Sequence, residues 1–209
     1  MKRVGFVVLL LALVLPIAAW ANSNIVFQNT GGNVTTNGST ITLTNSTLTS
    51  FTGLNGIPIT GNLGTVNFTT GALLSGSLGT SAVLAAGGSF TITGNGTNGL
   101  PNGVLFSGSF SGPVNWIGTY NPLGNGGKGN WTYVLTGTVM GTLNNGQAAG
   151  GGTVQLTFDV PGSKQFGKGH GARLNTGVTT VTVPEPGTLG LLGTGLLGIA
   201  GLVRRKLKA

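Results

Sequence analysis

The feature that most constrains the fold of this chain is an alternation of apolar and small polar residues that recurs between residues 25 and 183. Its longest run covers residues 131–143, where one face carries the apolar side chains Trp131, Tyr133, Leu135, Val139 and Leu143. Shorter runs occupy residues 25–27, 40–44, 65–69, 89–93, 104–111, 153–160 and 181–183. A period of two residues is that of a β-strand with one buried face, so the pattern predicts roughly ten short strands.

Turn signals separate these runs. Among them are the Asn-Gly pairs that begin at Asn37, Asn55, Asn102 and Asn145. This dipeptide favours the positive φ angles that tight hairpins require. We expect the turn at residues 143–146, extended through residues 147–152, to join two adjacent antiparallel strands.

Helical and repeat patterns are weak in this region. Residues 72–86 come nearest to an amphipathic helix, but Gly76 and Gly79 disfavour it. No internal repeat has a period of about twenty residues or more, which leaves a β-solenoid as the minor alternative. We therefore predict an all-β fold, a single antiparallel β-sandwich of jelly-roll type.

The first 21 residues have the form of a secretory signal peptide. Lys2 and Arg3 supply the basic start, an apolar run follows, and the Ala-Trp-Ala at residues 19–21 fits the cleavage rule. The apolar run is too short for a permanent membrane span. Cleavage is predicted before Asn22, so the exported domain is predicted to be residues 22–183.

The C-terminal segment, residues 184–209, has three parts. The tripeptide Pro-Glu-Pro comes first and stays extended, because its prolines fix φ and remove two backbone donors. Residues 187–203 carry no charge and would span about 26 Å as a helix, slightly less than the roughly 30 Å of a bilayer core. Basic residues follow: Arg204, Arg205, Lys206 and Lys208. By the positive-inside rule we predict a transmembrane helix at residues 187–203, with the domain outside the inner membrane.

This order of tripeptide, apolar span and basic end resembles the PEP-CTERM sorting signal of Gram-negative bacteria. The matching positions are Pro184, Glu185, Pro186, Arg204 and Arg205. The resemblance is confined to the tail and implies recognition by an exosortase-like membrane enzyme, transient residence in the inner membrane, and transfer to the cell surface or extracellular matrix. It also implies an association with exopolysaccharide. An ordinary C-terminal membrane anchor is the alternative.

The net charge of +8 comes mainly from the two ends of the chain. Within residues 22–183 the net charge is +3, from Lys128, Lys164, Lys168 and Arg173 against Asp159. Nucleic-acid-binding domains usually present a concentrated basic face. Because this one is also predicted to be exported, we expect no nucleic-acid partner.

Acidic residues are too few for most hydrolytic chemistry. Glycoside hydrolysis usually needs two carboxyl groups, and the domain has only Asp159, since Glu185 lies in the tail. His170 and Asp159 could join Ser163 in a triad, but no nucleophile elbow precedes a helix. One histidine, one aspartate and no cysteine do not suffice for a zinc or calcium site. We predict no catalytic residue, metal or cofactor.

Two groups of residues are candidates for ligand binding. Trp116 and Tyr120 lie near a turn and would stack on sugar rings if exposed, whereas Trp131 and Tyr133 are assigned to the core by their alternation.

The second group lies in the basic loop at residues 164–173, where Lys164, Lys168 and Arg173 accompany His170. It could bind an anionic polysaccharide or a lipid headgroup. A solvated loop without a ligand is the alternative.

These patterns predict an exported, non-catalytic structural protein that is sorted to the surface or matrix and associates with exopolysaccharide. The alternative is a carbohydrate-binding or adhesive module with the same sorting tail.

Overall fold

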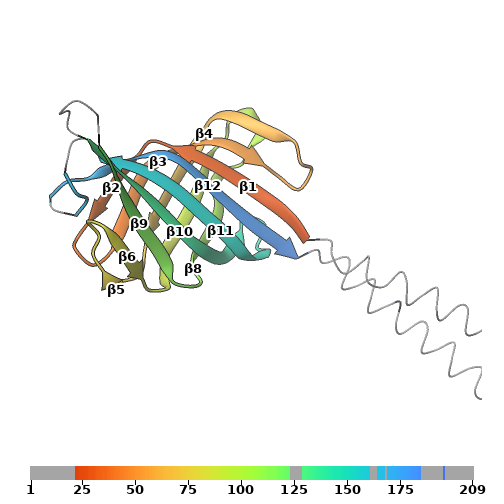
Figure 1. The fold of residues 1–209 in the computed structure, drawn as a ribbon. Coiled ribbons are helices and arrows are strands. Elements are labelled where there is room, and N and C mark those ends of the chain that lie inside the picture. The colour runs from red at the N-terminus through yellow and green to blue at the C-terminus, as the bar shows by residue number, and fades with distance from the viewer. Residues whose placement is uncertain (1–21, 123–128, 161–163, 168, 185–194, 196–209) are drawn as a thin grey trace, which may run out of the picture. The chain divides into compact units, whose positions relative to one another are not determined.

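The computed structural model describes residues 22–122, 129–160, 164–167, 169–184 and 195, which form an almost entirely β fold (Figure 1). In chain order, the elements are β1 (Asn22–Thr30), β2 (Asn33–Thr36), β3 (Ile41–Thr52), β4 (Pro58–Thr69), β5 (Leu73–Gly76), β6 (Ser81–Leu84), β7 (Gly87–Asn95), the 3-10 turn η1 (Thr97–Gly99), β8 (Asn102–Phe110), β9 (Val114–Asn121), β10 (Asn130–Leu143), β11 (Ala148–Val160) and β12 (Ala172–Pro184). The prediction of an all-β domain is confirmed. Residues Asn24–Val183 form a compact unit.

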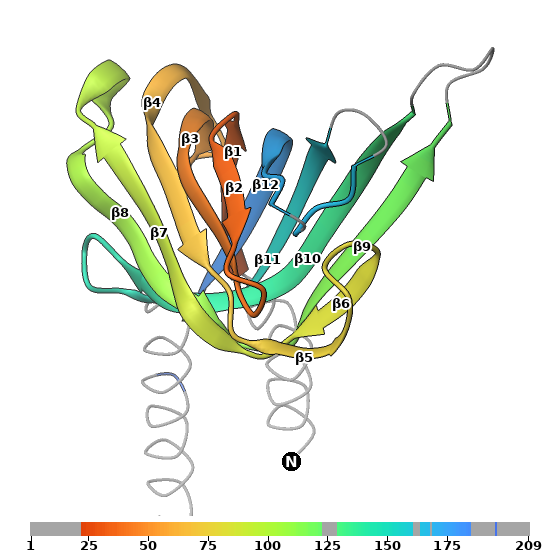
Figure 2. The same ribbon diagram turned by 90° about the vertical axis from the view of Figure 1, so that its left-hand side faces the viewer.

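Eight strands close into a ring of antiparallel pairs, in the order β2, β3, β4, β7, β8, β10, β11, β12 and back to β2. The closing pairs are Ala172 with Val34 and Arg173 with Asn33. The fold is thus a closed eight-stranded barrel with four outer strands, which corrects the predicted jelly-roll-like sandwich (Figure 2). Alternation identifies the buried face of several strands, but it does not show that β12 pairs with β2.

The outer strands mostly prolong strands of the ring. β1 continues β2 along β3, since Asn33 pairs with Thr44 and Thr30 with Thr47. β9 likewise continues β8 along β10, and Pro113, which has no backbone N–H to donate, lies at the break between them. The short hairpin of β5 and β6 extends the sheet beyond β9.

Aromatic rings fill much of the interior. The rings of Phe68, Phe90 and Phe110 lie 5.7–5.8 Å apart, centroid to centroid, and all three are buried. Gly108 lies on the apolar face of β8, where the sequence predicts a bulge or a close contact. A Cβ at this position would collide with the backbone of Met140, so the backbones of β8 and β10 pack closely there.

Both predicted targeting segments, residues 1–21 and 187–203, lie outside the described residues, apart from Gly195. Within the described part of the chain, the structure contains no helix with the length and hydrophobicity that a bilayer crossing requires.

Candidate ligand-binding surface

A row of aromatic side chains runs along the paired strands β9 and β10. Three cross-strand pairs share one face of this ladder: Trp116 with Leu135, Gly118 with Tyr133, and Tyr120 with Trp131. Because successive side chains on one face of a strand are two residues apart, the rings form a continuous row from the core to the end of β9.

Trp116 is the innermost member of this row and is fully buried, with 0% of its surface exposed. Its indole Nε1 donates a hydrogen bond to the carbonyl of Leu78 at 2.9 Å, and its ring stacks on that of Tyr133 at 4.8 Å. The prediction that Trp116 offers a surface ring is therefore wrong. Val114 and Trp116 face inward, and Ile117 takes the exposed side of the strand.

Tyr133 connects two loops beneath the surface. Its hydroxyl donates to the carbonyl of Gly79 at 2.9 Å and accepts from the backbone N–H of Phe166 at 3.0 Å. Phe166 is fully buried, and its ring packs 5.0 Å from that of Trp116. Burial raises the pKa of the Tyr133 hydroxyl, and this effect is larger than the lowering caused by the hydrogen bond from the Phe166 N–H. The basic loop is thus held to the barrel by the buried ring of Phe166, close to the first residue of the loop.

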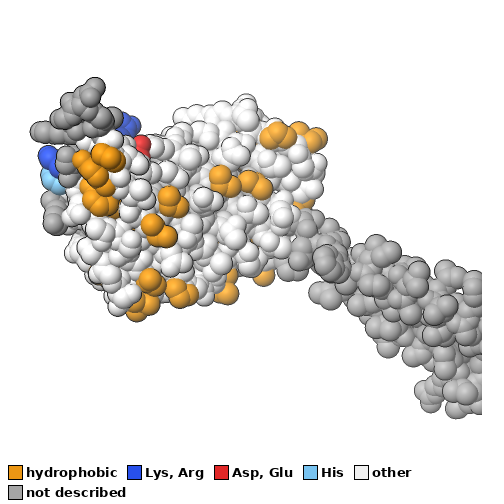
Figure 3. Space-filling model, viewed as in Figure 1, with side chains coloured by type: hydrophobic (Ala, Val, Ile, Leu, Met, Phe, Trp, Pro, Cys, Tyr) orange, Lys and Arg blue, Asp and Glu red, His pale blue; other side chains and the backbone are white. Residues whose placement is uncertain are grey.

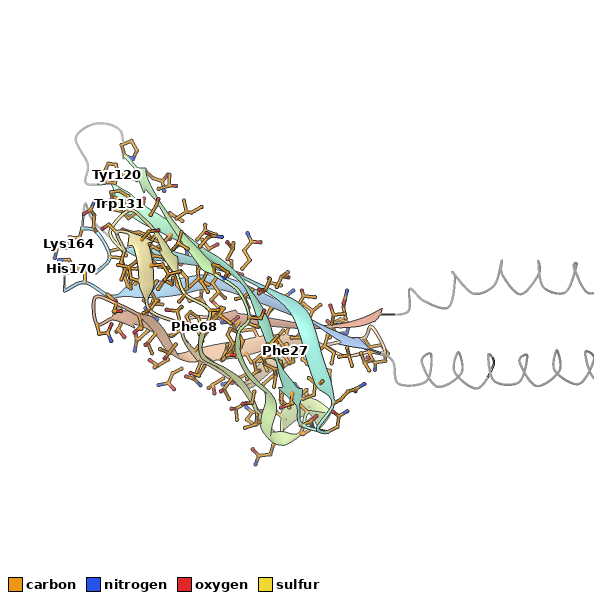
Figure 4. The ribbon with its side chains drawn as sticks, turned by 90° about the horizontal axis from the view of Figure 1, so that it is seen from below. Phe27, Phe68, Tyr120, Trp131, Lys164 and His170 are labelled. Atoms are coloured by element: carbon orange, nitrogen blue, oxygen red, sulfur yellow. The ribbon has the colours of Figure 1, made fainter. Side chains whose placement is uncertain are left out.

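Tyr120 and Trp131 form the outer end of the row (Figure 4). Their centroids are 5.5 Å apart, with 40% of Tyr120 exposed and Trp131 half-buried. Trp131 stacks in turn on Tyr133, at 5.8 Å and 20°. The ring of Tyr120 lies over Gly129, where a Cβ would come within 2.8 Å of its Cζ. Tyr120 is therefore a surface ring fixed from below, as a sugar-stacking residue needs to be.

The sequence assigns Trp131 only to the core and does not identify it as a surface candidate. The sequence nevertheless contained a signal for this pair, because Tyr120 and Trp131 are equally spaced about the glycine-rich stretch at residues 122–129. In an antiparallel hairpin such positions lie opposite each other.

Charged side chains gather near the aromatic pair. Lys164 and Arg173 are exposed and His170 is half-buried, whereas the predicted residue Lys168 lies outside the described residues. Figure 4 shows Lys164 and His170 at the end of the barrel that carries Tyr120 and Trp131, and Figure 3 shows basic side chains beside an apolar area at that end. We call Tyr120, Trp131, Lys164, His170 and Arg173 the distal surface.

The one acid of the domain, Asp159, is held by neutral donors. Its two carboxylate oxygens accept from the Thr132 hydroxyl at 3.0 Å and from the Asn175 side-chain amide at 2.6 Å. Arg173 is its partner in the β11–β12 ladder. Among the residues that the structure describes, no cluster of three or more His, Cys, Asp or Glu side chains is present to hold a metal ion.

The distal surface lies far from the point at which the tail leaves the domain. β12 begins at Ala172, beside the basic loop, and ends at Pro184. Its 13 residues at about 3.3 Å each span roughly 40 Å. The distal surface therefore lies at the opposite end of the compact unit from its last residue, Val183.

The tail itself carries the decisive sequence match. A family model for the PEP-CTERM protein-sorting motif matches residues 182–206. The chain carries a PEP-CTERM sorting motif. The match includes the five predicted signal residues Pro184, Glu185, Pro186, Arg204 and Arg205, of which only Pro184, the last residue of β12, is described.

The PEP-CTERM motif implies export, processing by exosortase, which is a membrane enzyme, and sorting to the cell surface. The motif covers only the tail, so it does not assign a role to the barrel. No curated protein and no solved structure matches this chain.

Proposed function

We propose that this protein is a non-catalytic surface or matrix protein that binds exopolysaccharide through the distal surface of its barrel. The observation that carries the proposal is the pairing of Tyr120 with Trp131 beside Lys164 and Arg173. An exposed ring stacks on the apolar face of a sugar, and nearby cations attract carboxylate or sulfate groups. The polysaccharide is therefore expected to be acidic.

The non-catalytic part of the proposal is supported by the shortage of carboxyl groups in the domain. Asp159 has its two oxygens engaged by Thr132 and Asn175, and the sequence offers no second acid within residues 22–183. Glycoside hydrolysis by the usual route needs two such groups across one bond.

A purely structural role without a ligand is the second candidate. The closed ring favours it, because a barrel leaves few unpaired strand edges and so resists aggregation outside the cell.

Affinity electrophoresis separates the two candidates. The full chain in mild detergent would be run through gels containing alginate, an acidic polysaccharide, or dextran, a neutral one. Binding predicts retardation by alginate, and Tyr120→Ala should weaken it roughly three- to tenfold. The matched control is Ile117→Ala, on the same strand but with its 54% exposed side chain on the opposite face. If the parent protein has the same mobility in the alginate and dextran gels, it does not bind the acidic polysaccharide, and the purely structural role is favoured.

A further inference from the structure

The end of the barrel nearest the tail differs chemically from the distal surface. Three connections meet at this end: residues 53–57 between β3 and β4, residues 96–101 between β7 and β8, and residues 144–147 between β10 and β11. Val26 of β1 pairs with Thr52, which brings the first connection beside the start of β1. We call these three connections the tail-proximal loops.

The other two loops lie at the same end. The β7–β8 connection is bound to the start of β4, because the side-chain amide of Asn98 donates to the carbonyl of Thr60 at 3.0 Å. The β10–β11 connection precedes Gly150, which pairs with Thr182 near the end of β12. β12 therefore ends beside these loops.

None of the tail-proximal loops contains an ionisable residue. All the lysine, arginine, histidine and aspartate residues of residues 22–183 fall between residues 128 and 173. This asymmetry matters at a membrane, because a charged group loses hydration on approaching the lipid tails, whereas asparagine and threonine are tolerated in the interface.

The β3–β4 hairpin adds apolar side chains to this uncharged end. Leu54 and Ile57 are 55% and 64% exposed, at the tip of a well-defined turn. The Gly56 N–H donates to the Gly53 carbonyl at 3.0 Å, and the Ile57 N–H donates to the Asn55 side chain at 3.1 Å. Figure 3 shows hydrophobic side chains at the end of the barrel that carries this hairpin. Backbone groups that are already paired within the turn lower the cost of bringing it against lipid.

The short stretch of chain between the barrel and the apolar tail segment indicates that the partner of these loops is the membrane. β12 ends at Pro184, and the uncharged segment of the sequence begins at Gly187. Two intervening residues, Glu185 and Pro186, reach at most about 10 Å when extended. A tail whose apolar segment lies in the bilayer therefore holds the tail-proximal loops at the lipid headgroups.

We propose that Leu54 and Ile57 enter the headgroup region of the outer face of the inner membrane while the sorting tail is uncut. The barrel then stands end-on, with its distal surface away from the membrane. This inference is independent of polysaccharide binding, because it uses neither Tyr120 nor the basic loop.

Spin labelling of the full chain tests the proposal directly. The natural sequence has no cysteine, so each introduced cysteine is the only labelling site. Two variants, Leu54→Cys and Ser39→Cys, would each carry a nitroxide on the introduced cysteine. Each would be reconstituted in vesicles of phosphatidylethanolamine and phosphatidylglycerol. Ser39 is exposed in the β2–β3 turn, at the end where β12 begins. Accessibility to oxygen, which partitions into lipid, is compared with accessibility to a water-soluble nickel chelate.

The label at residue 54 should be accessible to oxygen and protected from nickel, whereas the label at residue 39 should show the reverse. Adding Ile57→Asn to Leu54→Cys should return the label at residue 54 toward water. Nickel accessibility at residue 54 equal to that at residue 39 would overturn the proposal. Lipid exposure at both residues would also overturn it, because the barrel would then lie on its side. Dipolar broadening of the spectrum at residue 54 would overturn it as well, because a second copy of the chain would then cover the hairpin.

Discussion

Tyr133 lies directly opposite Gly118 in the β9–β10 ladder, and its ring occupies the space that a side chain at position 118 would need. A Cβ at Gly118 would lie 2.5 Å from Cε1 of Tyr133 and 2.6 Å from the carbonyl of Thr80. This glycine therefore allows the aromatic row to continue from the core to Tyr120.

The first prediction concerns that glycine. Gly118→Ala should lower the free energy of unfolding by about 1–3 kcal/mol, because the ring of Tyr133 or the backbone of the β5–β6 loop must move. Gly150→Ala is the control, since a Cβ there meets nothing within 4 Å. It should change stability by no more than about 0.5 kcal/mol in urea denaturation. Equal effects of the two substitutions would contradict the packing described for this row.

The second prediction concerns the Tyr133 hydroxyl. Tyr133→Phe removes the partner of both the Gly79 carbonyl and the Phe166 N–H. Leaving such buried groups unpaired should cost about 1–3 kcal/mol of unfolding free energy near pH 8. Faster amide hydrogen exchange at Phe166 in the variant would show that the basic loop has loosened. Unchanged exchange there would mean that the loop is held by other contacts.

The third prediction concerns the same hydroxyl at high pH. Burial raises the pKa of folded Tyr133, so the unfolded chain ionises first, near pH 10. The stabilisation is fully present below that pH and is lost as the pH rises toward the folded pKa. The stability gap between the parent and Tyr133→Phe should therefore shrink as the pH rises above about 10, the ordinary pKa of tyrosine. Thermal denaturation of both proteins over a series of pH values measures this gap. A constant gap would show that the hydroxyl is not the titrating group.

The fourth prediction concerns the cations of the distal surface. Replacing Lys164 and Arg173 together by glutamine should weaken alginate binding roughly two- to tenfold and flatten its dependence on salt. Lys164→Arg with Arg173→Lys preserves both charges and should bind as the parent does. Loss of binding in this charge-preserving variant would show that side-chain shape, rather than charge, determines recognition.

The fifth prediction concerns sorting. Glu185→Ala, or deletion of residues 204–208, should leave the protein in the inner membrane of its native host. Thr188→Ala, which keeps the motif and the basic end, should reach the surface. Surface labelling of intact cells followed by membrane fractionation measures the distribution. Normal delivery of both defective variants would disprove the assignment of the signal.

Local patterns predicted much of this protein. The buried face of residues 131–143 could be recognised because one-sided burial leaves an alternation in the sequence, and Tyr133, Leu135 and Val139 are indeed fully buried. The turn before β11 was also predictable, since Asn145-Gly146 favours the backbone that a tight hairpin needs. The expected extension of this turn through residue 152 was wrong, because residues 148–152 belong to β11 and pair with β10.

Other features depend on contacts between distant residues. β9 was missed because Ile117 faces outward beside the inward Trp116, which interrupts the alternation. The closure of the barrel depends on pairing Ala172 with Val34, and no local pattern encodes such a contact. Trp116 is covered by the β5–β6 hairpin, where its indole donates a hydrogen bond to the Leu78 carbonyl. Its exposure could therefore not be judged from the residues beside it in the sequence.

Hydrogen–deuterium exchange of the full chain, with and without alginate, tests the central claim that the ligand binds at the end of the barrel remote from the tail. We predict slower exchange at residues 118–122, 129–133 and 164–173, and no change at residues 53–57, 96–101 and 144–147. Protection confined to the tail-proximal loops, or no protection anywhere at saturating polysaccharide, would contradict the account.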